Sequence, residues 1–297
     1  MPNHAITFVD PWQLRQEGEQ QAFPVGIDRR CLAQGDSWFS IGALPPGLTS
    51  NILAELVLSP SMAVVNCARP GKELRLMVDT MQDSNFTRFL AGGNLAVEFD
   101  AIFVSGGGND MIAAASVPPS ADPVQQIFLT PVQRGGMQVP VTQYLSQNGW
   151  KAFSDHITHW FGSLVSSRDS GVNKNKPLFF HNYEYCRPRP AGAGLGFGPW
   201  LNTAMGNYSI PEGDRLALTN ELMDRLSRLL SDIVAANIAR DPNCNIFLID
   251  TRTGAHLDLA AEGSTGESGD WINEIHPSYQ GYRKIASVWR QQVDPHI

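Results

Sequence analysis

The chain has 297 residues, of which 42% are hydrophobic and 17% charged, and its formal net charge is −7. This composition is sufficient for a full-sized core, and we interpret residues 1–297 as a single domain. The basic residues are dispersed, which argues against a nucleic-acid partner, and no apolar run is long enough to predict a membrane span.

Residues 1–29 are interpreted as an extension that precedes the core. They lack the basic stretch and the apolar segment of a signal peptide, so we expect a cytoplasmic protein, with signal-independent export as the alternative. The cysteines show no CxxC spacing, and we expect free buried thiols rather than disulfides or metal ligands. They are Cys31, Cys67, Cys186 and Cys244.

Short apolar runs alternate with helical patterns along the chain, which is typical of an α/β fold with a parallel sheet. The run at 101–105 is apolar nearly throughout, as a strand buried on both faces should be. The predicted strands are residues 30–34, 61–67, 101–105, 177–183 and 245–250.

Two helices are predicted in the second half of the chain. Leucine, isoleucine and valine recur at helical spacing over residues 211–240, with Pro211 near the start and Pro242 after the end. A second apolar stripe predicts a helix that starts near Ser278 and runs towards the C-terminus.

Two stretches fit neither a strand nor a helix. Residues 114–147 are rich in Pro, Gly and Gln, and residues 186–207 are dense in Gly and Pro. Irregular insertions of this length are typical of lids, binding loops or disordered segments. We interpret 186–207, which offers Phe197 and Trp200, as a substrate-shaping loop, with a plain linker as the alternative.

Polar segments follow three of the predicted strands at the point where each strand ends. Gly-Asp-Ser at 35–37 follows the first strand, Arg-Pro-Gly at 69–71 the second, and Gly-Gly-Gly-Asn-Asp at 106–110 the third. His276 and Pro277 directly precede the last helix. Because ligands collect outside the carboxyl ends of strands in open α/β sheets, we expect these segments to form one site.

These residues supply what acyl transfer requires. A serine hydroxyl becomes a good nucleophile when an adjacent base takes its proton, so Ser37 is the candidate nucleophile and His276 its general base. The developing oxyanion needs donors placed in advance. The candidate donors are the backbone N–H groups of Ser37 and Gly71 and the side-chain amide of Asn109.

Together the four segments resemble the signature blocks of the SGNH (GDSL-type) hydrolases, which carry Ser, Gly, Asn and His in that order. They read GDSW at 35–38, NCARPG at 66–71, GGND at 107–110 and NEIHP at 273–277. The resemblance extends over residues 31–290. It implies a three-layer α/β/α sandwich on a five-stranded parallel, flavodoxin-like sheet, and ester hydrolysis with no metal and no cofactor.

The residue that orients His276 departs from the pattern of the family. Members usually place an aspartate three residues before the histidine, where this chain has Asn273. An orienting carboxylate fixes the tautomer and stabilises the imidazolium. We therefore expect Asp270 to reach back across a helical turn or bend. The alternatives are Asn273 or a nearby backbone carbonyl, and then Glu274.

Other polar residues near these segments receive simpler interpretations. Asp36 and Asp110 are expected to be turn or cap residues that hold their loops. The glycines at 106–108 match no phosphate-binding or dinucleotide-binding motif. His181, at the end of the fourth predicted strand, is expected in the core or at the rim of the pocket.

His156 and His159, with Asp155 beside them, hint at a metal site. A third ligand at a recognisable spacing is missing, so we expect a solvated helix face instead.

The leading function is carboxylic ester hydrolysis on a small-molecule or saccharide acyl ester, through an acyl-enzyme on Ser37. The same site could serve a carbohydrate O-acetyl esterase, a thioesterase or a lipase. A binding protein that kept the fold with weakened catalysis is a further alternative, suggested by Asn273. The aromatic residues near the site suit acyl chains and sugar rings equally: Trp38, Phe39, Phe197 and Trp200.

Overall fold

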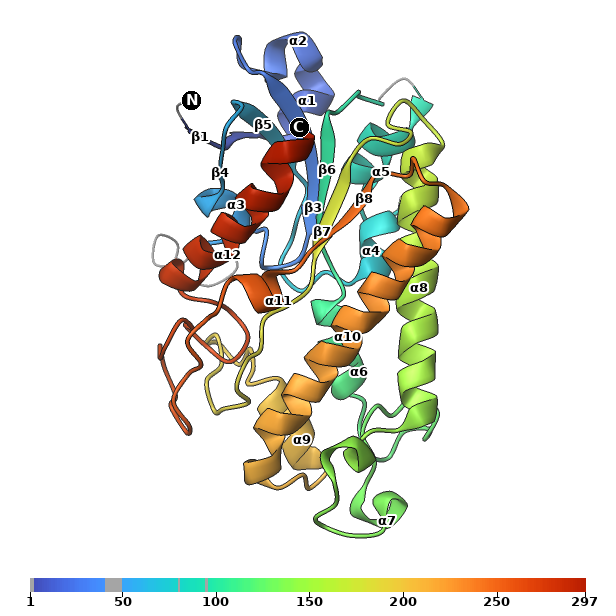
Figure 1. The fold of residues 1–297 in the computed structure, drawn as a ribbon, viewed down its shortest axis with the longest axis vertical. Helices are drawn as coiled ribbons and strands as arrows, with labels where there is room; N and C mark the ends of the chain where they lie inside the picture. Colours follow the sequence, from blue (N-terminus) through green and yellow to red (C-terminus); the bar gives the residue numbers. More distant parts are fainter. Residues whose placement is uncertain (1–2, 41–49, 80, 94–95) are drawn as a thin grey trace.

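The computed structural model describes residues 3–40, 50–79, 81–93 and 96–297. Its centre is a sheet in which all neighbouring strands are parallel, in the order β2-β5-β3-β6-β7-β8 (Figure 1). The strands are β2 (Thr7–Val9), β3 (Arg29–Gly35), β5 (Met62–Asn66), β6 (Ala101–Ser105), β7 (Leu178–His181) and β8 (Ile246–Ile249).

The five predicted strands are confirmed, but the expected number of strands in the sheet is wrong. The additional strand, β2, comes from the segment interpreted as an extension, and it pairs with β5 at the edge of the sheet. β2 has only three residues, and Phe8 at its centre is 48% exposed, so its pattern is too short to predict a strand. The remaining order, β5-β3-β6-β7-β8, is the expected flavodoxin-like one.

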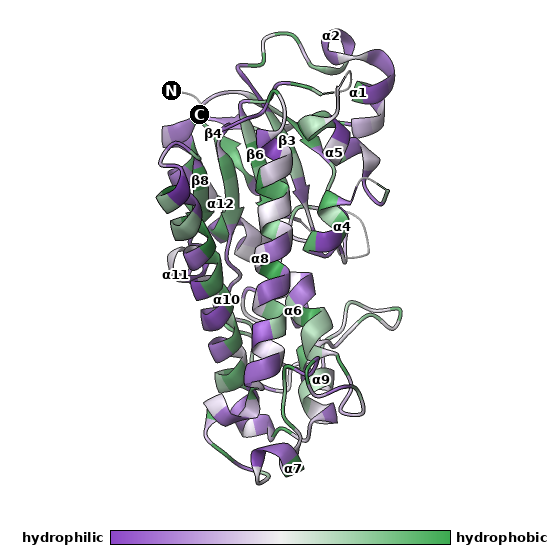
Figure 2. Ribbon diagram, turned by 90° about the vertical axis from the view of Figure 1, so that its right-hand side faces the viewer, coloured by the Kyte–Doolittle hydropathy of each residue, from purple (hydrophilic) through white to green (hydrophobic). Residues whose placement is uncertain are grey.

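Helices cover both faces of the sheet, which gives the three layers of the predicted sandwich (Figure 1). One face carries α3 (Ile52–Glu55) and α12 (Tyr279–Val293), which contact each other. The other carries α4 (Leu74–Val78), α5 (Ser84–Ala91), α8 (Gln147–Asp169) and α10 (Glu212–Arg240). Figure 2 views the molecule from the side of α8, with the strands behind it. α10 and α12 are the two predicted helices.

Two of the longer helices, α8 and α12, begin at a serine cap. The Ser278 hydroxyl accepts a hydrogen bond from Gly281 N at the start of α12, and Ser146 does the same for Gly149 N at the start of α8. α12 buries Tyr282, Ile285 and Trp289 on one stripe, so this helix is held by its apolar face.

The chain beyond the carboxyl ends of the strands forms a packed region around α8 and α10 (Figure 1). It contains α6 (Gly108–Ala115), α7 (Pro131–Arg134), a 3₁₀ helix (Val141–Tyr144) and α9 (Leu201–Asn207). Phe128 and Tyr144 are buried there, and the Arg134 guanidinium donates to the carbonyls of Tyr208 and Ser209. Residues 114–147 are therefore packed against the rest of the chain.

Smaller elements complete the fold. β1 (His4–Ala5) and β4 (Val57–Leu58) form a separate antiparallel pair. The short helices are α1 (Pro11–Glu17), α2 (Glu19–Ala22), α11 (Thr251–Gly254) and a C-terminal 3₁₀ helix (Asp294–His296). All four cysteines are free and buried, as predicted.

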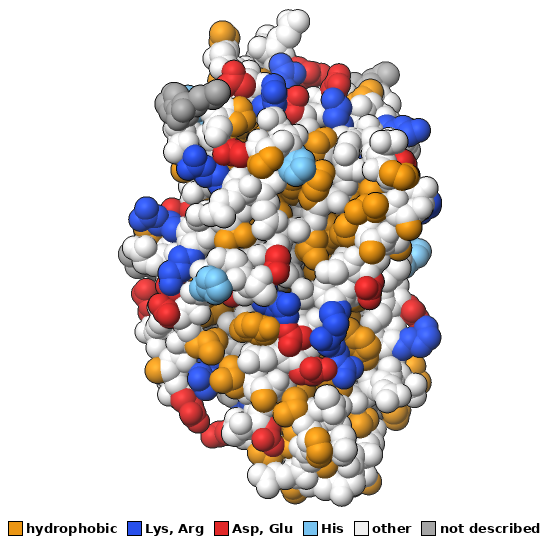
Figure 3. Space-filling model, in the orientation of Figure 1, with side chains coloured by type: hydrophobic (Ala, Val, Ile, Leu, Met, Phe, Trp, Pro, Cys, Tyr) orange, Lys and Arg blue, Asp and Glu red, His pale blue; other side chains and the backbone are white. Residues whose placement is uncertain are grey.

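Of the helices that the structure describes, none has the length and apolar character needed to cross a membrane. On the face drawn in Figure 3, acidic and basic side chains are interspersed and do not gather by sign.

Candidate active site

Ser37 lies on a tight turn directly after β3. Gly35 ends the strand against β6, where an added Cβ would meet the Ser105 backbone oxygen at 2.9 Å, so this position requires glycine. The Asp36 carboxylate accepts a hydrogen bond from Trp38 N at 2.9 Å, and the Asp36 carbonyl accepts from Phe39 N at 3.2 Å. The turn therefore forms from residues adjacent in the sequence. It leaves Ser37 6% exposed.

A buried polar network holds Asp36 from below. Its carboxylate accepts hydrogen bonds from Tyr183 OH at 2.6 Å and Ser105 Oγ at 2.8 Å, and Ser105 Oγ also lies 3.0 Å from His181 Nε2. Burial raises the pKa of Asp36 to about 6, against the opposing effect of these hydrogen bonds. Asp36 thus holds its loop, as predicted, and His181 is a core histidine whose pKa burial lowers to about 4.

His276 meets Ser37 with one ring nitrogen and Asn273 with the other. His276 Nε2 lies 2.7 Å from Ser37 Oγ, and Nδ1 lies 3.0 Å from Asn273 Oδ1. Asn273 Oδ1 also accepts from the backbone N–H groups of Ile275 and His276, which fixes the orientation of the amide. Nδ1 therefore carries the proton, and Nε2 presents a lone pair to the serine. Burial lowers the pKa of His276 to about 4.

Asp270, the residue first expected to orient His276, lies elsewhere. Its carboxylate accepts hydrogen bonds from Lys284 Nζ at 2.6 Å and from Asp258 N at 2.7 Å. The chain turns between Asp270 and His276, but the contact that results is between backbones, from Ser278 N to the Asp270 carbonyl at 2.7 Å. Because Lys284 on α12 binds the Asp270 carboxylate, the expectation that Asp270 contacts the histidine is wrong.

Glu274, the last alternative, also faces away from the imidazole. Its carboxylate accepts backbone hydrogen bonds from Trp200, Leu201 and Asn202 at the start of α9, and from Arg189 N. Burial raises the pKa of Glu274 to about 7, opposed by these N–H groups. Glu274 therefore ties the histidine loop to residues 186–207.

Residues 186–207 support the histidine loop from several sides. The buried Arg189 guanidinium donates to the carbonyls of Gly266, Trp271 and Asn273. The Trp200 ring lies edge-on to the His276 ring with centroids 5.5 Å apart. The segment is thus neither a plain linker nor a free loop, although Phe197 at its tip is 66% exposed.

The segments expected to supply the oxyanion donors are brought together by Asn109. This residue lies in the first turn of α6, and its Nδ2 donates to the Lys72 carbonyl at 3.2 Å. Gly71, one residue earlier in that loop, has φ +75°, which suits glycine. Asn109 and Ser37 line one pocket, whereas Gly71 is outside its lining.

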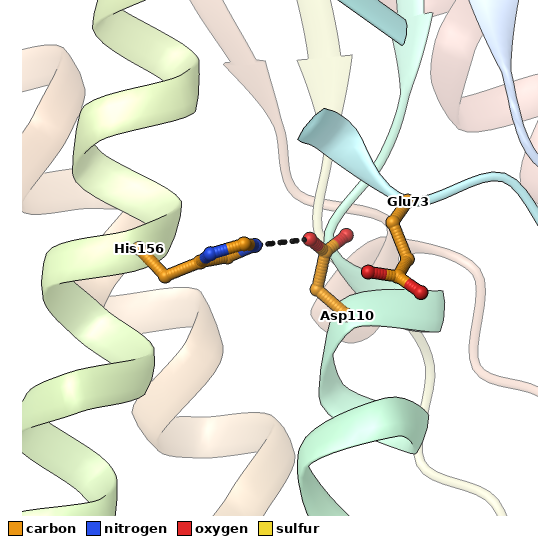
Figure 4. Close-up of side chains that lie close together, drawn as sticks. All are labelled: Glu73, Asp110 and His156. Carbon is orange, nitrogen blue, oxygen red and sulfur yellow. Dashed lines mark hydrogen bonds and ion pairs between the residues drawn. The ribbon is translucent and has the colours of Figure 1, made fainter. Parts of the chain in front are cut away.

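Asp110 and His156 help to hold the Gly71 loop and the start of α6 in place (Figure 4). Asp110 Oδ2 accepts from Leu74 N at 3.0 Å, and Asp110 Oδ1 lies 3.0 Å from His156 Nε2 on α8. The hydrogen bond with Asp110 raises the pKa of His156. Asp110 is a loop-holding residue, as predicted, but His156 is not simply on a solvated face.

Glu73 completes a group with Asp110 and His156 whose ligand atoms all lie within 4.8 Å of one another, the spacing that a metal ion needs. Within the part of the chain that the structure describes, no second group of three has this spacing. Both Asp110 oxygens already have partners in the protein, so hydrogen bonds within the chain account for the positions of Asp110 and His156. His159 packs against Trp160, and Asp155 pairs with Lys151.

A pocket lies beside Ser37 and Asn109. Most of its wall is apolar or aromatic: Trp38, Met111, Ile112, Cys186, Leu201, Met223, Trp271 and Ile275. Of the aromatic residues predicted to contact substrate, Trp38 lines this pocket, whereas Phe39 is buried in the core. A cavity of this kind suits a small apolar group with a few polar atoms.

Three residues of the site were not predicted from the sequence: Tyr183, Glu184 and Arg189. Tyr183 and Glu184 follow the end of β7, the position where site residues are expected in an α/β sheet, and that placement was the available signal. Arg189 gave no local signal, because its partners lie about 80 residues further along the chain.

Neither a family model nor a curated relative matches the sequence of the chain. The fold is similar to that of the lipase Lip_vut3 from the goat rumen metagenome, with a TM-score of 0.52 and 14% identity over 90% of this chain and 98% of that chain. The acetylxylan esterase Axe2 from Geobacillus stearothermophilus gives a TM-score of 0.46 at 14% identity, over 91% and 96% of the two chains. An extracellular lipase from Streptomyces rimosus gives 0.46 at 14% identity, over 87% and 98%.

At this identity the likeness concerns the fold. Together with the parallel sheet, its strand order and its two helical layers, it confirms the predicted three-layer α/β/α sandwich.

Proposed function

We propose that this chain is a serine hydrolase that cleaves carboxylic esters through an acyl-enzyme on Ser37. The observation that carries the proposal is the geometry around His276. Its Nε2 lies 2.7 Å from Ser37 Oγ while Asn273 Oδ1 holds Nδ1 at 3.0 Å. An imidazole in this tautomer can accept the serine proton as the hydroxyl attacks a carbonyl carbon.

The reaction proceeds in two halves. Ser37 Oγ attacks the ester carbonyl, its proton moves to His276 Nε2, and the carbonyl oxygen becomes an oxyanion. The Asn109 amide and the N–H groups of Ser37 and Gly71 are the proposed donors to that oxyanion. His276 then protonates the departing alcohol. In the second half, water gives a proton to the same nitrogen and attacks the acyl-enzyme. His276 then returns that proton to Ser37 Oγ as the acid is released.

Asn273 takes the place of the usual carboxylate in this mechanism. It fixes the tautomer and the ring orientation through its carbonyl oxygen, but it supplies no negative charge to the imidazolium. We therefore propose a Ser37–His276 pair oriented by an amide, which works with a less basic histidine than an aspartate would give. A binding protein without catalysis would not require this alignment of the tautomer.

Hydrolysis of p-nitrophenyl acetate, butanoate and octanoate, together with acetylated sugars, tests the proposal. The wild-type chain should release p-nitrophenol or acetate, and Ser37→Ala prepared in parallel should not. Equal release by the two proteins, or no turnover of any ester by the wild type, would contradict ester hydrolysis at Ser37.

A further inference from the structure

The pocket beside Ser37 contains a carboxyl group that the proposed mechanism does not use. Glu184 follows β7, is 3% exposed and lines the same pocket as Ser37 and Asn109. Its Oε1 is buried and has no hydrogen-bond partner among the residues that the structure describes. Buried polar atoms are nearly always paired, so an unpaired one in a substrate pocket calls for a partner from outside the chain.

The charged groups around Glu184 do not pair with it. Asp250 and Asp270 raise its pKa while Arg252 and Lys284 lower it, so these neighbours act in opposite directions. Each of the two bases is engaged elsewhere. Arg252 binds Asp224 and the Tyr185 hydroxyl, and Lys284 binds Asp270 and Asp258.

Burial is the largest influence on Glu184 and raises its pKa to about 8. The carboxyl is therefore mostly protonated at neutral pH. A protonated carboxyl can donate one hydrogen bond and accept another, which a carboxylate cannot do.

The pocket lies on the acyl side of the proposed reaction. Ser37 and Asn109, which would contact the acyl carbon and its oxygen, both line it, whereas His276 does not. The departing alcohol must lie near His276, because Nε2 protonates it. An acyl chain that enters the pocket from Ser37 therefore brings its substituents towards Glu184.

We propose that Glu184 is a specificity-determining residue that selects acyl groups carrying a hydroxyl. This inference rests on the proposed ester hydrolysis at Ser37. The protonated carboxyl donates to the hydroxyl oxygen of the substrate, and its carbonyl oxygen accepts the hydroxyl proton. The apolar walls around it, such as Met111 and Met223, contact the carbon chain.

The test compares p-nitrophenyl esters of hydroxylated acids with their unsubstituted parents. Suitable pairs are 3-hydroxybutanoate with butanoate and 6-hydroxyhexanoate with hexanoate, so that the hydroxyl is offered at two depths. At pH 7 the wild type should favour at least one hydroxylated ester by about tenfold in kcat/KM, the effect of one well-placed hydrogen bond.

Three variants test whether Glu184 is the residue that gives the preference for hydroxylated esters. Glu184→Met, which is apolar and of similar length, should raise the thermal stability and lose the preference for the hydroxylated ester. Glu184→Gln, which still donates and accepts, should retain it. Met223→Leu alters an apolar wall of the same pocket and should also retain it.

The outcomes separate this inference from the proposed function. If the wild type hydrolyses the parent esters but prefers none of the hydroxylated ones, or if Glu184→Met keeps the preference, Glu184 does not select a hydroxyl. A preference for a trimethylammonio-acyl ester that Glu184→Gln abolishes would overturn it in favour of a cation site. If no ester is hydrolysed, ester hydrolysis itself fails and this inference fails with it.

Discussion

The turn that carries Ser37 and the loop that carries His276 are held by different means. Ser37 follows a strand directly, and its turn is fixed by Asp36 and by Ser105 on the next strand. His276 stands at the end of an irregular segment, residues 255–278. That segment is held by Arg189 and by the contacts of Glu274 with α9, which come from residues 186–207.

The nucleophile turn and the histidine loop should therefore differ in how well they tolerate substitutions elsewhere in the chain. The Ser37 turn depends on a strand end and on a short network inside the core, so few substitutions outside that network should displace it. The His276 loop depends on backbone carbonyls held by one buried guanidinium and on one buried carboxyl group. Substitutions that displace a catalytic residue should therefore move His276 more readily than Ser37. The following substitutions test this difference between the two regions.

The largest effect is expected at the nucleophile itself. Ser37→Ala should lower kcat for a p-nitrophenyl ester by on the order of 10⁶, because it removes the attacking atom, while the folded structure is kept. Ser40→Ala is the matched control, since among the described residues the Ser40 hydroxyl donates to the Asp36 carbonyl alone. More than a few per cent of activity in Ser37→Ala would remove Ser37 from the mechanism.

Asn109→Ala should have the next largest effect. Loss of one oxyanion donor lowers kcat by roughly 10²–10³ with little change in KM. Steady-state kinetics on a single ester separate the two constants. An effect confined to KM would mean that Asn109 shapes the pocket without stabilising the oxyanion.

Asn273→Ala should lower kcat by about 10², because the tautomer of His276 is no longer fixed and a buried N–H is left unpaired. Asp270→Ala should leave kcat unchanged, since its carboxylate binds Lys284. The reverse ranking of these two variants would restore Asp270 as the orienting acid.

The pH dependence of kcat/KM tests whether the group that orients His276 is uncharged. His276 must be neutral to accept a proton, and burial lowers its pKa to about 4, so kcat/KM should fall only as the pH drops through about 4. Asn273→Asp should raise the pKa of His276 and move this acid limb upwards by at least about one unit. An acid limb near pH 6.5 in the wild type would contradict an uncharged orienting group.

Arg189→Met should have the smallest effect on the chemistry and should act through the histidine loop. The carbonyls of Gly266 and Asn273 lose their donor, which should cost ~3 kcal/mol of folding stability and about tenfold in kcat. Limited proteolysis should cut residues 255–275 faster than in the wild type. Arg228→Met is the control, because that side chain is 63% exposed.

The nucleophile turn and the histidine loop also differ in how far the sequence could predict them. The five predicted strands are short apolar runs, and the two predicted helices, α10 and α12, follow an apolar pattern of period 3.6. Ser37, Asn109 and His276 lie in short segments next to those elements. The partner of His276 could not be predicted in the same way. Asp270 is a carboxylate at a plausible distance along the chain, but Lys284 on α12 takes it, and that contact depends on the tertiary fold.

Labelling with a fluorophosphonate tests the central claim most directly, because this probe reacts only with a serine that a nearby base activates. Intact-mass measurement of the wild type should show one adduct per chain, located by peptide mapping at Ser37. Ser37→Ala should show none, and His276→Ala should react far more slowly. An unlabelled wild type, or an adduct that persists in Ser37→Ala, would contradict the assignment of Ser37 as a nucleophile activated by His276.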